Sequence, residues 1–256
     1  MSCILETQGL CKAFGAVTAA KDVNVRIKQG EVVGVIGSNG AGKTTFINMV
    51  TGYLKPCSGQ ILFNSQSIIG RTPRAITRLG MARSFQVAQL FPQLSVMDNL
   101  LIAVAAAQNP FPSLLAPMRT AARVALADAM LEQFDIARWR DTQVTAVPQG
   151  VRKLIDIAMA LIGEPQMLLL DEPTSGVSAE EKTALMDTVM RVVAERQVTV
   201  LFVEHDMDVV RRYVSRILAF YSGEVLADGA PEQVLANPRV QEFVTGSQKV
   251  HKRAGQ

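Results

Sequence analysis

A run of residues near the amino terminus has the types and spacing needed to hold a nucleoside triphosphate by its phosphates. The run fits the pattern G-x-x-x-x-G-K-[ST] and reads Gly37, Ser38, Asn39, Gly40, Ala41, Gly42, Lys43, Thr44 and Thr45. Glycines let backbone N–H groups close around phosphate oxygens, and a following helix N-terminus adds unpaired donors. We expect Lys43 to neutralise the β- and γ-phosphates and Thr44 to ligate Mg²⁺.

The flanking segments decide between a phosphate-binding loop and an ordinary glycine-rich turn with a solvated lysine. Residues 31–36 are mostly apolar and rich in valine, which predicts a buried strand, and residues 46–51 continue as an amphipathic helix. This strand–loop–helix setting gives the pattern its specificity. The sequence therefore predicts that the chain binds a nucleoside triphosphate.

A second set of candidate residues follows the apolar run Leu168–Leu170. Asp171 and Glu172 come directly after this run, and Pro173 follows before any helix begins. Asp171 is placed to hold Mg²⁺ through water opposite Thr44, and Glu172 to orient and deprotonate an attacking water. A helix N-cap is the ordinary reason for an acid after a strand, but it does not explain two acids that end a wholly apolar strand.

Two further polar residues end other predicted strands. Gln86 ends a strand near 83–86, and its amide could reach Mg²⁺ or the attacking water only when the helical region after it swings in. His205 follows the apolar run 199–203, where it could donate to γ-phosphate oxygens. A lone glutamine is ordinarily a surface residue and a lone histidine a packed or solvated one. The position of His205 after a third apolar strand favours a functional role.

The elements that must position these residues form a βαβ-type core with an insertion. Residues 4–36 alternate like short antiparallel strands, with turns at Gly9, Phe14-Gly15 and Gln29-Gly30. Residues 87–162 are mostly helical: a capping box of Ser95 and Asp98 opens a helix over 96–107, and further helices run over 118–134 and from about Gly150.

The core resumes after this helical region. Apolar runs at 166–170 and 199–203 predict strands buried on both faces, and a second capping box of Ser178 and Glu181 opens a helix between them. A hairpin follows over 218–226. The predicted fold is α/β: one domain with a mainly parallel sheet and an N-terminal antiparallel β subdomain (1–86 and 163–256), plus an inserted all-helical lobe (87–162).

Composition excludes several classes of protein. The chain has 256 residues and is 48% hydrophobic, enough for a full core. Its 26 basic and 23 acidic residues give a net charge of +3, too balanced to indicate a nucleic-acid partner, and the only basic cluster is the tail around 249–253. No apolar stretch approaches the roughly 20 residues that cross a bilayer. The cysteines, Cys3, Cys11 and Cys57, lack metal-ligand spacing and are expected to be reduced.

Taken in order, these features resemble the ATPase subunits of ABC transporters over nearly the whole chain. The phosphate loop, a glutamine, a helical lobe, a glycine before a helix, the run L-L-L-D-E-P, a capped helix and a strand-end histidine follow the family's sequence. The resemblance implies hydrolysis of ATP with Mg²⁺, with Glu172 as general base and His205, Lys43 and Gln86 beside it. It also implies that Phe14, which by itself would be a core residue, stacks on adenine.

Finer features are similar to the importer ATPases for branched-chain amino acids and related amides. They are the segments 80–86, 90–100, 204–207 and 223–234, together with an extra loop around 109–118 that resembles the longer of the two paired ATPases. The resemblance implies two transmembrane permease subunits, a second ATPase that is a paralogue or a copy, and a periplasmic or extracellular solute-binding protein acting through the permeases. It implies a peripheral position on the cytoplasmic face of the inner (cell) membrane.

The chain departs from the family in its signature segment. The family normally reads L-S-G-G-Q or a near variant, whereas this chain reads Val147, Pro148, Gln149, Gly150 and Val151. The serine hydroxyl is lost, and Pro148 has no N–H to donate. Since the family's signature closes over the nucleotide of the other subunit, losing a donor there costs about 1–3 kcal/mol. The loop 175–178 also ends in Ser178, where many relatives carry an acid. The expected result is an asymmetric heterodimer, with a homodimer of two weakened sites as the competing arrangement.

Three rival functions remain open at this level. A transporter ATPase for another cargo, such as lipid, would differ only in its permeases. An ATP-gated clamp on ribosome or DNA usually carries two ATPase domains, a long coiled coil or a basic arm, which this chain lacks. A regulatory nucleotide-binding subunit with little hydrolysis would fit the unusual signature, but the presence of Glu172 argues against it.

Overall fold

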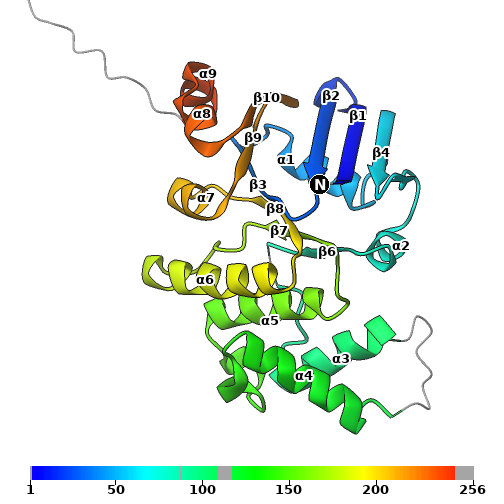
Figure 1. The fold of residues 1–256 in the computed structure, drawn as a ribbon, viewed down its shortest axis with the longest axis vertical. Helices are drawn as coiled ribbons and strands as arrows, with labels where there is room; N and C mark the ends of the chain where they lie inside the picture. The colour runs from blue at the N-terminus through cyan, green and yellow to red at the C-terminus, as the bar shows by residue number, and fades with distance from the viewer. Residues whose placement is uncertain (1, 87, 109–116, 246–256) are drawn as a thin grey trace, which may run out of the picture.

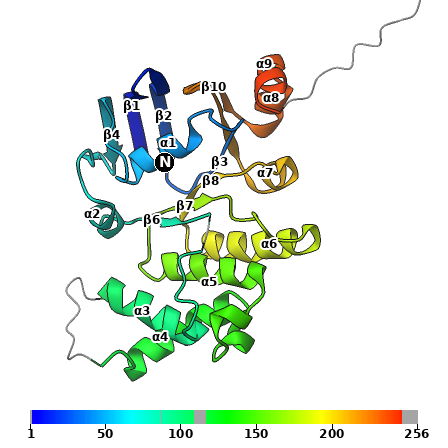
Figure 2. The ribbon, with the colours of Figure 1, turned by 180° about the vertical axis from the view of Figure 1, so that it is seen from behind.

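Two sheets and a lobe of helices make up the molecule. The computed structural model describes residues 2–86, 88–108 and 117–245. The helical lobe lies at one end, the N-terminal antiparallel sheet at the other, and a six-stranded sheet between them (Figures 1 and 2). Within these ranges, no helix has the length and apolar character required to span a membrane. The two sheets and the helical lobe confirm the predicted fold class.

A long hairpin dominates the antiparallel sheet. β1 (Cys3–Phe14) pairs with β2 (Val17–Lys28) and, on its other side, with β4 (Ser58–Phe63), which pairs with β5 (Gln66–Ser67). The turn predicted at Gly9 is wrong, because β1 runs through this residue. Gly9 lies instead at a register shift between β1 and β2, with φ of +57°, and its N–H donates to Asn24 Oδ1 over 2.8 Å. A bulge and a turn both favour glycine, so the residue alone does not separate them.

The six-stranded sheet has the order β10-β9-β3-β8-β7-β6. Its strands are β3 (Val32–Gly37), β6 (Met81–Ser84), β7 (Met167–Asp171), β8 (Thr199–Val203), β9 (Arg216–Tyr221) and β10 (Glu224–Gly229). All neighbours pair in parallel except β9 and β10, which form the predicted hairpin. Because β3, β7 and β8 are parallel, their carboxyl ends meet at one edge, which places the segments after Gly37, Leu170 and Val203 close together.

Helices cover both faces of this sheet. They are α1 (Lys43–Val50), α2 (Pro73–Arg78), α6 (Ala179–Glu195), α7 (Met207–Tyr213), α8 (Pro231–Ala236) and α9 (Pro238–Phe243). Ser178 caps α6 as predicted, since its Oγ accepts the N–H of Glu181. The short helices α2, α7 and α9 were absent from the sequence prediction, because six or seven residues carry too little periodicity to mark a helix.

The lobe consists of α3 (Val96–Gln108), α4 (Ala121–Gln133) and α5 (Gln149–Leu161), with 3₁₀ turns at Ala137–Trp139 and Val144–Ala146. The predicted capping box is present, because Ser95 Oγ accepts the N–H of Asp98 and donates to its carboxylate. The helix predicted over 118–134 begins later, at Ala121, since Thr120 caps it. Most of the extra loop predicted around 109–118, and the basic tail, fall outside the described residues.

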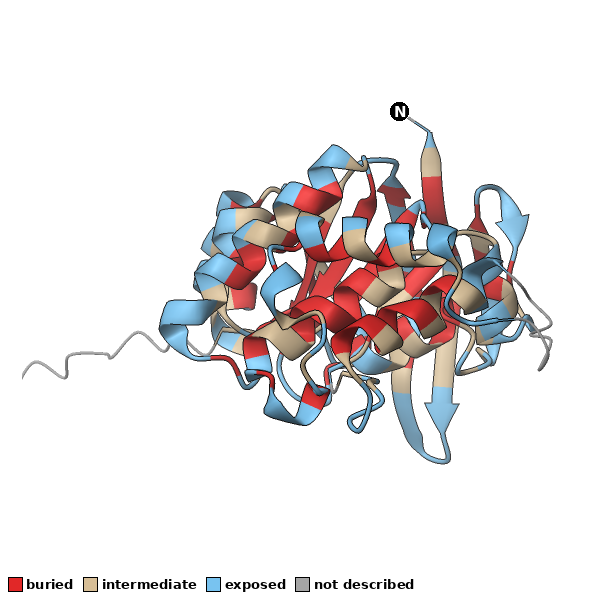
Figure 3. Cartoon of the chain, turned by 90° about the horizontal axis from the view of Figure 1, so that it is seen from below, coloured by how far each residue is buried: buried red, intermediate tan, exposed pale blue. Residues whose placement is uncertain are grey.

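Neighbouring residues of the central strands point into two different hydrophobic clusters. Leu168 and Leu170 of β7 belong to the cluster shared with the lobe and α6, whereas Leu169 belongs to the cluster shared with α1 and the antiparallel sheet. Viewed from the lobe end, buried residues gather on the central helices and exposed residues lie mostly towards the periphery (Figure 3). The sheet is therefore buried on both faces, which explains why its strands are continuous apolar runs.

Candidate nucleotide site

The phosphate-binding loop lies between β3 and α1. β3 ends at Gly37 and α1 begins at Lys43, as the strand–loop–helix setting requires. The N-cap residue is Gly42, with φ of +102°, and no side chain caps the first turn. The backbone donors of that turn are thus left for an anion, which a helix N-terminus favours.

Gly42 occupies a position that no other residue type fits. A Cβ there would lie 2.5 Å from the carbonyl oxygen of Ala19 in β2 and 3.2 Å from Gly223 in the turn between β9 and β10. That turn also donates from Gly223 N–H to the carbonyl of Ala41 over 2.9 Å. The loop is therefore braced from two sides, and its shape is built before any ligand arrives.

Lys43 is buried across the loop. Its side chain is 6% exposed, and its Nζ donates to the carbonyl oxygens of Gly37, over 2.6 Å, and Ser38, over 3.1 Å. Burial lowers the pKa of Lys43, and the nearby carboxylates of Glu172 and Asp171 partly oppose that shift. A lysine desolvated in this way gains from a phosphate placed within reach of its Nζ.

Three residues predicted from separate segments meet at the end of β7. Gln86 Nε2 donates to Glu172 Oε2 over 2.6 Å, and His205 Nε2 lies 3.2 Å from Glu172 Oε1. Glu172 has φ of +48°, a left-handed conformation that is rare for a residue with a side chain. Such strain persists only where the surroundings over-determine it, and here it directs the carboxylate between the glutamine and the histidine.

Asp171 forms an ion pair with an arginine that was not predicted from the sequence. Arg83, at the end of β6, forms an ion pair with Asp171 Oδ2 at 2.7 Å and donates to Asn48 of α1 over 2.7 Å. Its guanidinium also lies 4.9 Å from the ring centroid of Phe85. Through its contacts with Asp171 and Asn48, Arg83 links the end of β7 to the helix that follows the phosphate loop. No sequence pattern marks Arg83, and its need for a partner is evident only from the burial of β6.

Most of the other predicted residues are exposed. Phe14, at the tip of the β1–β2 hairpin, is 51% exposed, and Lys12 Nζ lies 5.3 Å from its ring centroid. A large aromatic residue this exposed is not part of the core, which is the position the residue type alone would suggest. Ser38, Asn39, Gly40 and Thr44 are exposed, Thr45 is half-buried, and Ala41 is buried. The surface that surrounds the loop is thus open to a ligand.

Comparisons with known proteins show the family of this chain. The family model of the ABC transporter matches residues 20–175, more than half of the chain. The chain belongs to the ABC transporter family. It is 34% identical over 245 residues to the high-affinity branched-chain amino acid transport ATP-binding protein BraF of Pseudomonas aeruginosa, covering 93% of this chain and 95% of that protein.

Two further relatives cover almost the same length. The high-affinity branched-chain amino acid transport ATP-binding protein LivG of Escherichia coli K12 is 35% identical over 243 residues, covering 93% of this chain and 95% of LivG. The ADP conformation of MJ1267, an ATP-binding cassette of an ABC transporter, has a TM-score of 0.83 and 30% identity, covering 94% of this chain and 98% of that structure. This ABC ATPase binds ATP and hydrolyses it to power transport.

The predicted signature segment of this ABC ATPase is partly buried. Val147 is 2% exposed and Gly150 is buried, whereas Pro148 and Gln149 reach the surface. Pro148 is the N-cap of α5 and contributes no side-chain cap. Arg152 donates to the carbonyl of Val147 over 2.8 Å and so holds the segment against α5. None of the residues from Val147 to Val151 carries a hydroxyl, so the segment offers no Oγ donor of its own at this helix N-terminus.

The helix that begins in this segment also contacts the Gln86 segment. Lys153 is fully buried and donates to the carbonyl of Gln86 and, over 3.4 Å, to that of Glu172. Asp156 accepts from Ser84 Oγ over 2.6 Å, and burial raises its pKa despite that bond. Neither residue was predicted from the sequence. The signal that could have identified them is a pair of charged residues among the apolar residues of the helix after Gly150.

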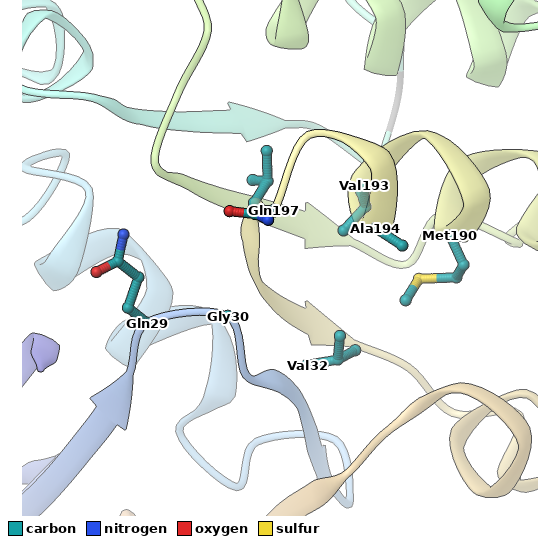
Figure 4. Close-up of a pocket in the computed structure, with 8 residues that line it drawn as sticks. Gln29, Gly30, Val32, Met190, Val193, Ala194 and Gln197 are labelled. Atoms are coloured by element: carbon teal, nitrogen blue, oxygen red, sulfur yellow. The ribbon is translucent and has the colours of Figure 1, made fainter. Parts of the chain in front are cut away.

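A separate cavity of about 440 Å³ lies away from these residues. It is lined near Gln29 and Gly30, before β3 begins, and near Gln197 and Val198, before β8 begins (Figure 4). The cavity thus lies at the amino ends of the strands, whereas the phosphate loop, Glu172 and His205 follow their carboxyl ends. It is not part of the nucleotide site.

Proposed function

We propose that this ABC ATPase powers the import of branched-chain amino acids or related small amide solutes. The cargo is supported by relatives named as branched-chain amino acid transport proteins that match the chain over nearly its full length. The hydrolytic role is supported by one observation above the others: Glu172 is held between Gln86 and His205 at the sheet edge that also carries the phosphate loop.

In this proposal the phosphate loop binds the ATP phosphates. Backbone N–H groups from Ser38 to Thr45 and the Nζ of Lys43 contact the β- and γ-phosphates, and Phe14 stacks on adenine from the hairpin tip. Lys43 exchanges the carbonyls of Gly37 and Ser38 for phosphate oxygens, which bind a lysine more strongly because they carry charge.

We propose that Mg²⁺ binds between Thr44 and Asp171. Thr44 is exposed at the first turn of α1, and among the described residues Arg83 contacts Asp171 through Oδ2, so that Oδ1 could serve as a further oxygen donor. These oxygen donors fit a hard ion that keeps several waters and takes few protein ligands. When bound, the ion would neutralise charge on the β- and γ-phosphates.

Glu172 acts as the general base in this proposal. Its carboxylate accepts a proton from the attacking water, while Gln86 fixes the position of that water and the side chain of Glu172. His205 then donates to a γ-phosphate oxygen, where negative charge gathers during transfer, and Lys43 balances the same charge. No covalent intermediate is required.

We propose that the remaining partners follow from this role. The chain works on the cytoplasmic face of the cell membrane, bound to two permease subunits, and an external solute-binding protein delivers the cargo to them; nucleic acid is not a partner. Residues 1–86 and 163–256 form the core, and 87–162 form the lobe. This division is supported by the end of β6 at Ser84 and the return of the chain to the sheet at Met167.

Deletion of the gene is expected to abolish high-affinity uptake of radiolabelled leucine, isoleucine and valine by intact cells. Restoring the wild-type gene is expected to recover uptake, whereas the Glu172→Gln gene is not, because the permeases then receive no energy from hydrolysis. The measurement is the initial rate of uptake at low solute concentration. Unchanged uptake of leucine, isoleucine and valine in the deletion strain would contradict the proposal that they are the cargo. It would favour another cargo, such as lipid.

We also propose that the ATPase pair is asymmetric. This chain carries its own phosphate loop, Asp171, Glu172 and His205. The ATP bound there would be hydrolysed opposite the signature segment of a paralogous partner. The nucleotide of the partner would face Pro148 and Gln149 and turn over slowly, because neither an Oγ donor nor a Pro148 N–H is present there. The loss of about 1–3 kcal/mol corresponds to roughly 5- to 150-fold in rate.

A single-turnover experiment on the purified pair tests this asymmetry. The wild-type pair is expected to hydrolyse one ATP per dimer in the initial burst, and a variant with Val147→Leu, Pro148→Ser, Gln149→Gly and Val151→Gln two. Pro238→Ser, which changes a proline at the first turn of α9, is the control and should leave the burst at one. A burst of two in the wild type, or a fully active homodimer of this chain, would contradict the proposed asymmetry.

A further inference from the structure

A buried carboxylate lies directly beside the catalytic edge of the sheet. Glu204 follows the last residue of β8 and is only 3% exposed. β8 lies between β3, which leads into the phosphate loop, and β7, which leads into Asp171 and Glu172. Glu204 therefore stands at the centre of the edge where the catalytic segments meet, although it has no assigned role in hydrolysis.

The two oxygens of Glu204 bind two different loops. Oε1 accepts from the backbone N–H of Thr174 over 3.1 Å and from its hydroxyl over 2.5 Å. Oε2 accepts from the backbone N–H groups of His205, over 2.9 Å, and Asp206, over 3.3 Å. One loop follows Glu172 and the other carries His205, so a single side chain joins the loops of the two proposed catalytic residues.

This carboxylate is stabilised by hydrogen bonds rather than by a contacting cation. Among the described residues, Glu204 forms no ion pair, whereas its neighbour Asp206 pairs with Lys182 at 2.8 Å. A buried charge persists only when its lone pairs are satisfied, and here four donors satisfy them. Moving either loop would break two of these bonds, which makes the positions of the loops interdependent.

The backbone around Glu172 is fixed against the same strand. Its N–H donates to the carbonyl of Val203, the residue before Glu204, over 2.9 Å. Its own carbonyl accepts the N–H of Ser175, the residue after Thr174, over 3.1 Å. Thr174 is thus part of a tight turn that begins at Glu172, the proposed general base, and a shift of Thr174 is transmitted to Glu172.

We propose that Glu204 is a positioning residue for ATP hydrolysis, which sets the spacing between Glu172 and His205 by clamping the turn at Thr174 to the His205 backbone. The inference rests on the proposed roles of Glu172 and His205. Glu204 itself neither contacts the γ-phosphate nor takes the proton. Its substitution therefore impairs the chemical step and leaves nucleotide binding, which depends on the phosphate loop, unchanged.

Glu204→Gln is the first variant that tests the clamp. An amide has the shape of the carboxylate, but its NH₂ end must face either Thr174 or the backbone N–H groups of His205 and Asp206, where donors already point at it. Thr174→Val removes one donor to the same carboxylate, and Thr174→Ser keeps it. Glu132→Gln, on an exposed position of α4, is the control for the loss of a carboxylate.

Glu204→Gln is expected to lower kcat about 10- to 100-fold, as a small misplacement of reacting groups does, with KM for ATP within twofold of wild type. Thr174→Val should lower kcat less, and Thr174→Ser and Glu132→Gln should retain it. The double variant Glu204→Gln with Thr174→Val should lose clearly less than the product of the two single losses, because both act on one contact.

Hydrogen exchange provides a readout independent of turnover. In Glu204→Gln, peptides covering 172–178 and 204–208 should lose protection together, while peptides covering the phosphate loop should not change. Multiplicative kinetic losses, exposure of one loop without the other, or equal changes in kcat and KM would overturn the clamp. Thr174→Val keeps the test decisive if Glu204→Gln unfolds.

The same experiments separate this inference from the function on which it rests. If Glu172→Gln and His205→Ala hydrolyse ATP like the wild type, the proposed catalytic roles fail. If those variants lose activity while Glu204→Gln keeps wild-type kcat and protection, only the clamp fails.

Discussion

Glu172→Gln is expected to lower kcat for ATP hydrolysis at least about 100-fold and to leave ATP affinity unchanged. General base catalysis contributes about 10²–10⁴-fold, and an amide cannot accept the proton that the carboxylate takes. The substitution preserves the size of the side chain, and its amide oxygen can still accept from Gln86 Nε2, so the fold around the site should persist. The measurement is phosphate release under saturating Mg-ATP.

The assembly state gives an independent check of the same variant. Because ATP remains uncleaved, Glu172→Gln should accumulate an ATP-bound dimer with its ATPase partner that is visible by size-exclusion chromatography and disappears when ATP is removed. Glu132→Gln should behave as wild type in both measurements. Wild-type turnover in Glu172→Gln would show that another group takes the proton.

Lys43→Met is expected to weaken ATP binding about 100-fold and to abolish measurable hydrolysis. Charged hydrogen bonds contribute about 1.5–3 kcal/mol each, and Lys43 is proposed to contact two phosphates. Methionine retains the aliphatic length of the side chain without its charge. The measurement is titration calorimetry with ATP and Mg²⁺, with Lys28→Met, at an exposed position of β2, as the control.

Loss of folding would be a trivial cause of weak binding, and the geometry of Lys43 argues against it. Burial lowers the pKa of this lysine, so its charged form is disfavoured when no phosphate is present. Replacing it with a neutral side chain removes that desolvation penalty and offsets the two lost contacts with the Gly37 and Ser38 carbonyls. The melting temperature without nucleotide should therefore change little. ATP binding at wild-type strength would contradict the assigned role of the lysine.

The parts of the site that could be predicted from sequence are those encoded within single segments. The phosphate loop, and the acids that come after Leu170, are each defined by a short run that joins a buried strand to the polar residues at its carboxyl end. Their mutual proximity followed from a general rule, namely that parallel strands bring their carboxyl ends to one edge. The meeting of Gln86, Glu172 and His205 is the three-dimensional consequence of that rule.

The contacts that were missed join residues distant in sequence and ordinary in type. Arg83 and Asp171 are 88 residues apart, and Thr174 and Glu204 are 30 apart. No spacing pattern distinguishes such an arginine or glutamate from a solvated one, and only burial reveals that each charge must have a partner. The wrong turn at Gly9 has a similar origin, because the residue type is the same for a bulge and a reversal, and only the pairing of β1 with β2 decides.

The alternation of β7 residues between the two hydrophobic clusters makes the central sheet a stiff plate. Leu168 and Leu170 are anchored on the lobe side and Leu169 on the other, so the strand cannot tilt on one face without disturbing packing on the opposite face. A force that acts on the lobe through α5 is consequently distributed over the whole sheet and is not confined to the face that packs against the lobe. The strands between the lobe and the phosphate loop are close-packed, so a displacement of the lobe is transmitted through them to the loop.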